Sequence, residues 1–140
     1  MTTAWKKEII ALTELPAAKE RKIDASFFPP VGEESIQSWE QENSGTIPSE
    51  IRSYLCQSDG LEAQRGEIWP VLPLAQWTLI DDACACSEPV IRFGETGDYF
   101  YHVSLGHSPS IYRAEKFGSK LQFAAASFRK FLELIFRGDG

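Results

Sequence analysis

The apolar residues of this chain change their spacing at Gly60. Before that residue they recur every three or four positions, as on one face of a helix. After it they come in short β-branched and aromatic runs, as in strands, and the helical spacing returns from Ser127 onward. We therefore predict an α+β domain: a meandering antiparallel sheet covered on one face by N-terminal and C-terminal helices.

The first part of the chain contains one expected helix and a connector. Residues 4–15 carry apolar side chains at helical spacing, Thr3 is placed to cap the start, and Pro16 ends the pattern. The stretch 16–32 is mostly polar until it reaches two phenylalanines and two prolines. We expect it to be a connector whose two phenylalanine rings lie on the core.

Two short helices are expected between this connector and Gly60. In residues 33–43, acidic residues occupy the first turn, where they favour the helix dipole, and Ile36 and Trp39 share one face. A third helix begins at Pro48, which suits the first helical position, and ends before the Asp-Gly pair that closes at Gly60. The two helices are thus predicted to be joined by a tight turn.

Five strands are expected after Gly60, each a short run between turn residues. Their ranges are 68–72, 78–80, 90–93, 99–103 and 110–113. The turn 94–98 is too short for a parallel crossover, so the strands on either side of it are predicted to form an antiparallel hairpin.

The C-terminal helix has the clearest pattern in the chain. Phe128, Phe131, Leu132 and Ile135 stand at positions i, i+3, i+4 and i+7, and Ser127 lies near the start. These four side chains are expected to face the core.

Charge and composition narrow the classes of partner. The 140 residues carry a formal net charge of −6, and the basic residues form no cluster that would suit nucleic acid or an anionic membrane. No apolar run reaches the roughly 18 residues that a membrane span needs.

The 3 cysteines are an odd number, which favours reduced thiols. We expect a single domain over residues 1–140, located in the cytoplasm.

One segment resembles a metal or redox site. Cys84 and Cys86 lie one residue apart, closer than the usual pairs of a structural zinc site, which also needs four ligands. Cys56 with His102 or His107 would provide a thiol and a base, but nothing near them in the sequence activates either group. We expect no metal, no cofactor and no catalytic residue, and keep a thiol- or metal-dependent enzyme as a less favoured alternative.

Acidic side chains offer the remaining candidate site. Adjacent carboxylates such as Asp81 and Asp82 are usually solvated, but with other acids of the loops they could form a negative recognition surface. A large apolar residue such as Trp69 belongs in the core by default and would mark an interface if exposed. The candidate partner-binding residues are Asp59, Glu62, Glu67, Trp69, Asp81, Asp82, Glu95 and Asp98.

A series of short motifs runs along residues 33–136. The first four cover a helix, a turn, a second helix and its stop: Ile36-x-x-Trp39-Glu40, Gly45-Thr46-Ile47-Pro48, Ile51-x-x-Tyr54-Leu55 and Ser58-Asp59-Gly60-Leu61. The later ones are Ile68-Trp69-Pro70, Pro73-Leu74, Ile91-Arg92-Phe93-Gly94 and Ser127-Phe128-x-x-Phe131-Leu132. Their order resembles that of the SUKH superfamily, which includes the Smi/Knr-like regulators of cell-wall synthesis.

This resemblance implies an α+β fold and a function in binding. Many bacterial members of the superfamily are immunity proteins that neutralise a nuclease or deaminase toxin, and fungal members are regulatory interaction modules. We therefore expect a protein partner, in the first instance a basic toxin domain, with a regulatory or scaffold role as the alternative. The resemblance brings no catalytic residues with it. The chain departs from the family pattern at residues 84–87 and in the connector 16–32. These departures argue against the assumption that it binds the same partner as other members of the superfamily.

Overall fold

The computed structural model describes residues 3–80, 89–105, 109–118 and 120–137. The α-helices are α1 (Trp5–Thr13), α2 (Pro16–Glu20), α3 (Glu33–Asn43), α4 (Ser49–Leu55) and α5 (Phe128–Phe136). The strands are β1 (Leu61–Ala63), β2 (Ile68–Val71), β3 (Thr78–Ile80), β4 (Val90–Glu95), β5 (Tyr99–Ser104), β6 (Ile111–Glu115) and β7 (Gln122–Ala125). Two 3-10 helices, η1 (Gln64–Gly66) and η2 (Leu74–Gln76), lie between the strands.

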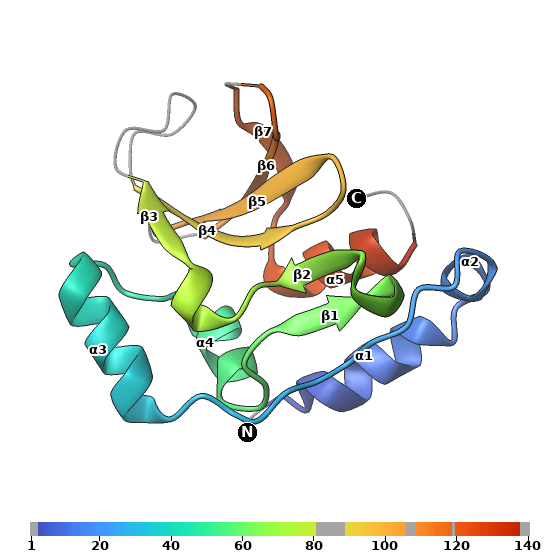
Figure 1. The fold of residues 1–140 in the computed structure, drawn as a ribbon, viewed down its shortest axis with the longest axis horizontal. Helices are drawn as coiled ribbons and strands as arrows, with labels where there is room; N and C mark the ends of the chain where they lie inside the picture. The colour runs from blue at the N-terminus through green and yellow to red at the C-terminus, as the bar shows by residue number, and fades with distance from the viewer. Residues whose placement is uncertain (1–2, 81–88, 106–108, 119, 138–140) are drawn as a thin grey trace.

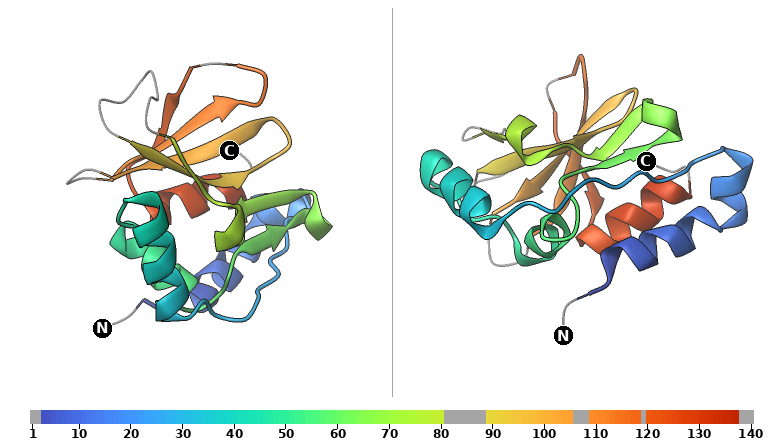
Figure 2. Two further views of the ribbon diagram at one scale, coloured as in Figure 1. Left: turned by 60° about the vertical axis from the view of Figure 1, so that its left-hand side comes forward. Right: turned by 60° about the horizontal axis from the view of Figure 1, so that its bottom comes forward.

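The strands form one antiparallel sheet. Its order is β1-β2-β4-β5-β6-β7, and β3 pairs with β4 outside that path. Figures 1 and 2 show α1, α3, α4 and α5 on the same side of this sheet. The predicted α+β architecture, with helices from both ends of the chain on one face of a meandering sheet, is confirmed.

The five predicted strands correspond to β2 through β6, with ends that differ by at most two residues. Sequence reasoning missed β1 and β7. The first has only three residues, and the second reads Gln-Phe-Ala-Ala, in which alanine and glutamine have little intrinsic preference for strands. Pairing with β2 and β6 holds these two segments in the sheet, and a local pattern does not report such pairing.

The N-terminal part of the chain differs from its prediction in two details. The connector 16–32 contains a short helix that was not predicted, α2, which begins at Pro16, where the missing N–H costs no helical hydrogen bond. Thr3 does not cap α1: the N-cap residue is Ala4, and no side chain accepts a hydrogen bond there. The backbone N–H of Trp5 instead donates to the side chain of Gln57 at 2.9 Å, so a residue distant in sequence satisfies this helix end.

Aromatic side chains join α5 to the sheet and to α1. The ring of Phe131 lies 5.3 Å from that of Phe93 in β4 and 4.9 Å from that of Tyr101 in β5. Phe128 meets Trp5 of α1 edge to face at 5.1 Å. All five side chains are buried, so the helical stripe predicted for the C-terminal segment does face the core.

Two of the tryptophans connect α3 to the sheet layer. Trp39 and Trp77 pack edge to face with 6.2 Å between ring centroids, and both are buried, as their size predicts. Trp69 differs from them, because it is half-buried and stacks on Phe28 of the connector at 5.5 Å. The connector therefore does lay an aromatic ring on the molecule, over β2.

Side-chain contacts fix the angle between α3 and α4. One oxygen of Glu40 accepts from the backbone N–H of Ile47 at 2.8 Å, and the other meets Arg52 at 2.8 Å. Arg52 also reaches Glu33 at 2.7 Å. The left-handed residue that ends α3 is Ser44, with φ of 53°. The tight turn expected here is thus held by a carboxylate that serves two partners.

Candidate protein-interaction surfaces

Two of the predicted partner-binding residues help to hold the fold. Asp59 accepts a hydrogen bond from the backbone N–H of Leu74 at 2.8 Å, which fixes the start of η2. Glu62 pairs through its backbone with Ser26, so that the connector runs beside β1. Of the two, Asp59 also lines a surface groove.

Four others lie around the ends of β2, β4 and β5. Trp69 is the Cα partner of Glu95 across the β2–β4 pair. The Glu95 carboxylate makes an ion pair with Lys116 at 3.3 Å, and the backbone N–H of Lys116 donates to the carbonyl of Asp98 at 3.0 Å. Asp98 is exposed, as is Glu67 just before β2. Lys116 thus compensates the charge of Glu95, and it meets Asp98 only through the backbone.

Several residues with candidate chemistry lie outside the described part of the chain, namely Asp81, Asp82, Cys84, Cys86 and His107. Cys56, which is described, is an exposed free thiol. Among the described residues, no group of three or more histidine, cysteine, aspartate or glutamate side chains could hold a metal ion.

His102 lies in β5 with only 2% of its surface exposed. Its Nε2 accepts a hydrogen bond from Nε of Arg92 at 3.3 Å. Burial, helped by the charge of Arg92, lowers the pKa of His102 to about 4, so the imidazole is neutral near pH 7. An imidazole whose lone pair is already engaged, and which solvent does not reach, is poorly placed to act as a base for a thiol.

A groove of about 580 Å³ lies between α3, the end of the connector and η2. Its apolar lining includes Pro30, Val31, Trp39 and Leu74. These side chains come from three segments: two from the connector, one from α3 and one from η2. The groove is therefore formed where the connector enters α3 and where η2 lies against that helix.

Carboxylates surround this groove. Glu34 and Glu42 project from α3 on either side of Ser38, at positions i, i+4 and i+8 of one helical face, and Asp59 adds a third acid from the segment after α4. Glu34 and Glu42 stand about 12 Å apart along the helix axis, given the rise per residue of an α-helix. No lysine or arginine lines the groove, and no described cation lies within ion-pair distance of the three acids.

Sequence reasoning identified Asp59 but not its two acidic neighbours in this groove. The helix dipole alone accounts for the acids at the start of α3, and no local motif assigns a role to Glu42 near its end. A periodic signal does exist, because Glu34, Ser38 and Glu42 recur every four residues. Their proximity to Asp59 has no such signal, since the chain between them includes all of α4.

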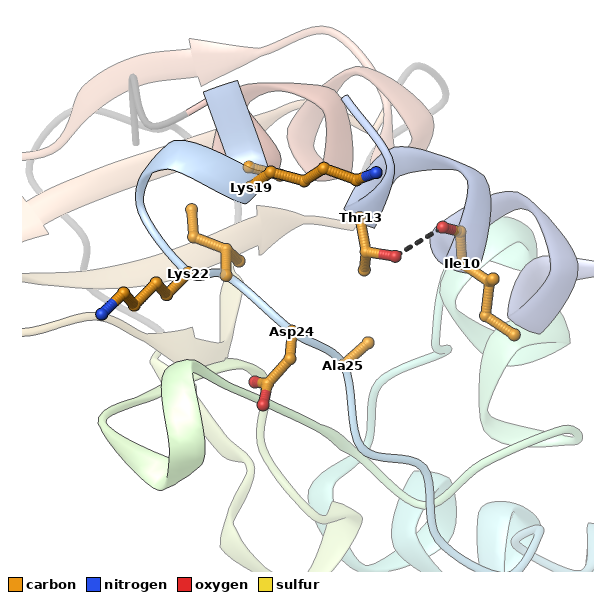
Figure 3. Close-up of a pocket in the computed structure, with 8 residues that line it drawn as sticks. Ile10, Thr13, Lys19, Lys22, Asp24 and Ala25 are labelled. Atoms are coloured by element: carbon orange, nitrogen blue, oxygen red, sulfur yellow. Dashed lines mark hydrogen bonds between the residues drawn. The ribbon is translucent and has the colours of Figure 1, made fainter. Parts of the chain in front are cut away.

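A second hollow, of about 410 Å³, lies among α1, α2 and the residues that follow α2. Figure 3 shows the Lys19 and Lys22 side chains pointing in opposite directions, with Asp24 directed elsewhere. The ammonium group of Lys19 pairs with Glu14 at 2.9 Å, and Thr13 donates to the carbonyl of Ile10 at 2.6 Å. The polar groups of this hollow thus do not converge on one point.

Comparison with protein-family models found no match, and comparison with curated proteins found none either. In the part of the chain that the structure describes, no helix is both long enough and apolar enough to cross a membrane.

Proposed function

We propose that this protein is a non-catalytic binding module of the SUKH type, and that it neutralises a toxin effector by binding it. The observation that carries the proposal is the groove beside α3, which combines an apolar lining with three carboxylates and no compensating cation among the described residues. Toxins that act on nucleic acids carry basic surfaces to hold phosphates, so an acidic groove is complementary to them.

The make-up of the groove suits a protein segment better than a small polar metabolite. Apolar contacts from Pro30, Val31 and Ala75, which keep exposed area, would contribute affinity through buried area, while the acids would select a basic sequence and speed its approach. Because the acids stand on a helix and on a loop bonded to η2, the site needs little ordering before it binds.

The proposal places the protein in the cytoplasm, where it would protect the cell that makes both proteins. A regulatory module with a different basic partner would use the same groove. The two roles differ in what binding achieves, so the test must measure relief of toxicity as well as affinity.

The test uses the product of the gene next to the one that encodes this chain. The toxin domain is expressed with and without the protein, and growth and binding are measured. Glu34→Lys with Glu42→Lys is expected to weaken binding by at least about tenfold, since two attractions become repulsions of several kcal/mol in total. The matched control is Glu20→Lys with Glu115→Lys, which makes the same change in net charge at exposed positions outside the groove.

Three results would contradict the proposal in different ways. If the neighbouring product is neither toxic nor bound, the immunity role is wrong. If it is bound without relief of toxicity, the regulatory role replaces it. If both double variants weaken binding equally, the protein acts through its overall charge and not through the groove.

A further inference from the structure

The sheet has a second face, which points away from the helices. Cα partners in the register place His102 opposite both Arg92 and Tyr112, and Tyr112 opposite Phe123. These residues alternate with Phe93 and Tyr101, which pack against α5, so they point to the other side. We call Arg92, Phe100, Tyr112 and Phe123 the open sheet face; His102 lies between them in the register but is buried. Among the described residues, no helix packs on it (Figure 2).

Arg92 lies at the centre of this face. Its guanidinium carbon is 4.0 Å from the centroid of Phe100, and its Nε donates to His102. No carboxylate of the described residues lies within ion-pair distance of it, although acids outnumber bases by 20 to 14 in the chain. Burial lowers the pKa of Arg92, and the charge of Glu95 opposes that shift only in part, but a guanidinium stays charged at neutral pH. A partly desolvated cation is thus held in one orientation.

The second cation near the face is compensated. Lys116 lies 5.3 Å from the same Phe100 ring, but its ammonium group pairs with Glu95 at 3.3 Å. Within the described residues, this face therefore has one cation that makes no ion pair, Arg92, and no series of neighbouring cations. A nucleic acid strand would meet too few cations here to neutralise successive phosphates, whereas a single carboxylate would be matched.

Two further aromatic rings lie on the same face, two and three strands away from Arg92. Phe123 in β7 is 61% exposed, and its ring meets that of half-buried Tyr112 edge to face at 6.2 Å. An aromatic ring so exposed at the end of a sheet gains from being covered, because burying apolar area is favourable by about 25 cal/mol per Å².

We propose that the open sheet face is a second docking surface, and that its occupant is a protein segment that carries a carboxylate and, a few residues away from it, an aromatic or aliphatic side chain. The carboxylate pairs with the guanidinium of Arg92, and the apolar side chain covers Phe123 and Tyr112. This surface is independent of the acid-lined groove, whose complement is basic. Together the two surfaces would let the chain hold two segments of opposite charge.

The experiment is an amide NMR titration of the full chain with three synthetic octapeptides, which alternate phenylalanine with glutamate, lysine or serine. The glutamate peptide is expected to shift the amide signals of the open sheet face and to bind at least about fivefold more tightly than the other two. Arg92→Gln should remove that preference. The matched control is Arg129→Gln, which also loses an arginine stacked on an aromatic ring, 5.4 Å from Trp5, but lies on α5.

Phe123→Ala provides a second test, since an exposed side chain can be truncated with little effect on folding. It is expected to weaken binding of the glutamate peptide several-fold. Equal binding of the glutamate and lysine peptides, shifts confined to other surfaces, or tighter binding of a single-stranded oligonucleotide would each overturn the proposal. The Glu34→Lys, Glu42→Lys protein should bind the glutamate peptide normally, so failure of the groove and failure of this face are distinguished.

Discussion

Arg52 of α4 meets Glu40 of α3 with 2.8 Å between Nη1 and Oε1. The same carboxylate accepts the N–H of Ile47, so it satisfies a backbone group in the turn between the helices while it neutralises the arginine. The Glu40 side chain is only 17% exposed, and its hydrogen bond to Arg52 is the largest cause of the raised pKa of that arginine. Removing one partner of a half-buried pair of this kind costs more than breaking a surface salt bridge, because the other charge is left without compensation.

We expect Glu40→Ala to destabilise the protein by about 2–3 kcal/mol, because a half-buried cation and a backbone N–H lose their partner together. Chemical denaturation at pH 7 measures the change. The control is Glu33→Ala, which removes the more exposed of the two carboxylates on Arg52 and is expected to cost less than about 1 kcal/mol. Equal losses for the two variants would show that Glu40 has no role beyond its charge.

His102 is expected to make the protein less stable in mild acid. Its pKa is about 4 in the folded chain and about 6.5 when unfolded, so between those values the unfolded state binds more protons. Stability is fully present above about pH 6.5 and falls as the pH drops towards 4, by about 3 kcal/mol at most for this group. Denaturation at pH 7 and pH 5 should show a smaller loss for His102→Gln than for the natural chain. An unchanged loss would mean that other groups account for it.

Position 94 requires glycine because the backbone of β2 lies too close to leave room for a Cβ atom. A Cβ at this position would collide with the backbone carbonyl of Pro70, which cannot rotate away. Gly94→Ala is expected to destabilise the chain by about 2–4 kcal/mol, as strain at a packed backbone does. Gly97, three residues later in the same hairpin, has open space where a Cβ would stand, so Gly97→Ala should be nearly neutral. Thermal unfolding compares the pair, and equal shifts in Tm would argue against the collision with Pro70.

The N-terminal ends of α1 and α5 offer a matched pair of variants that test helix capping. The hydroxyl of Ser127 accepts from the N–H of Lys130 at 3.2 Å, so Ser127→Ala should cost about 1 kcal/mol. Thr3 makes no such bond at the start of α1, and Thr3→Ala is expected to change stability by less than about 0.5 kcal/mol. Urea denaturation of both variants measures the difference. A larger loss at Thr3 than at Ser127 would contradict the assignment of both caps.

Much of the fold could be predicted because its signals are local. The spacing of Phe128, Phe131 and Ile135 fixes a helical face, and the turn 94–98 forces the strands beside it to be antiparallel. Strand β7 carries no comparable signal, since its residues owe their conformation to the hydrogen bonds of β6. The helical spacing of α1 is local, but its first N–H donates to Gln57 and not to a neighbouring hydroxyl, so the partner at this helix end is set by tertiary structure.

The candidate sites were less predictable than the fold. The sequence by itself determined that the chain is acidic and that helices flank an antiparallel sheet, because charge and hydrophobic period are properties of residues in order. Only the tertiary structure decided that Glu34 and Glu42 share a groove with Asp59, and that Arg92 stands without a described carboxylate partner among aromatic rings. Such neighbours come from different elements, and the packing of those elements sets which side chains meet.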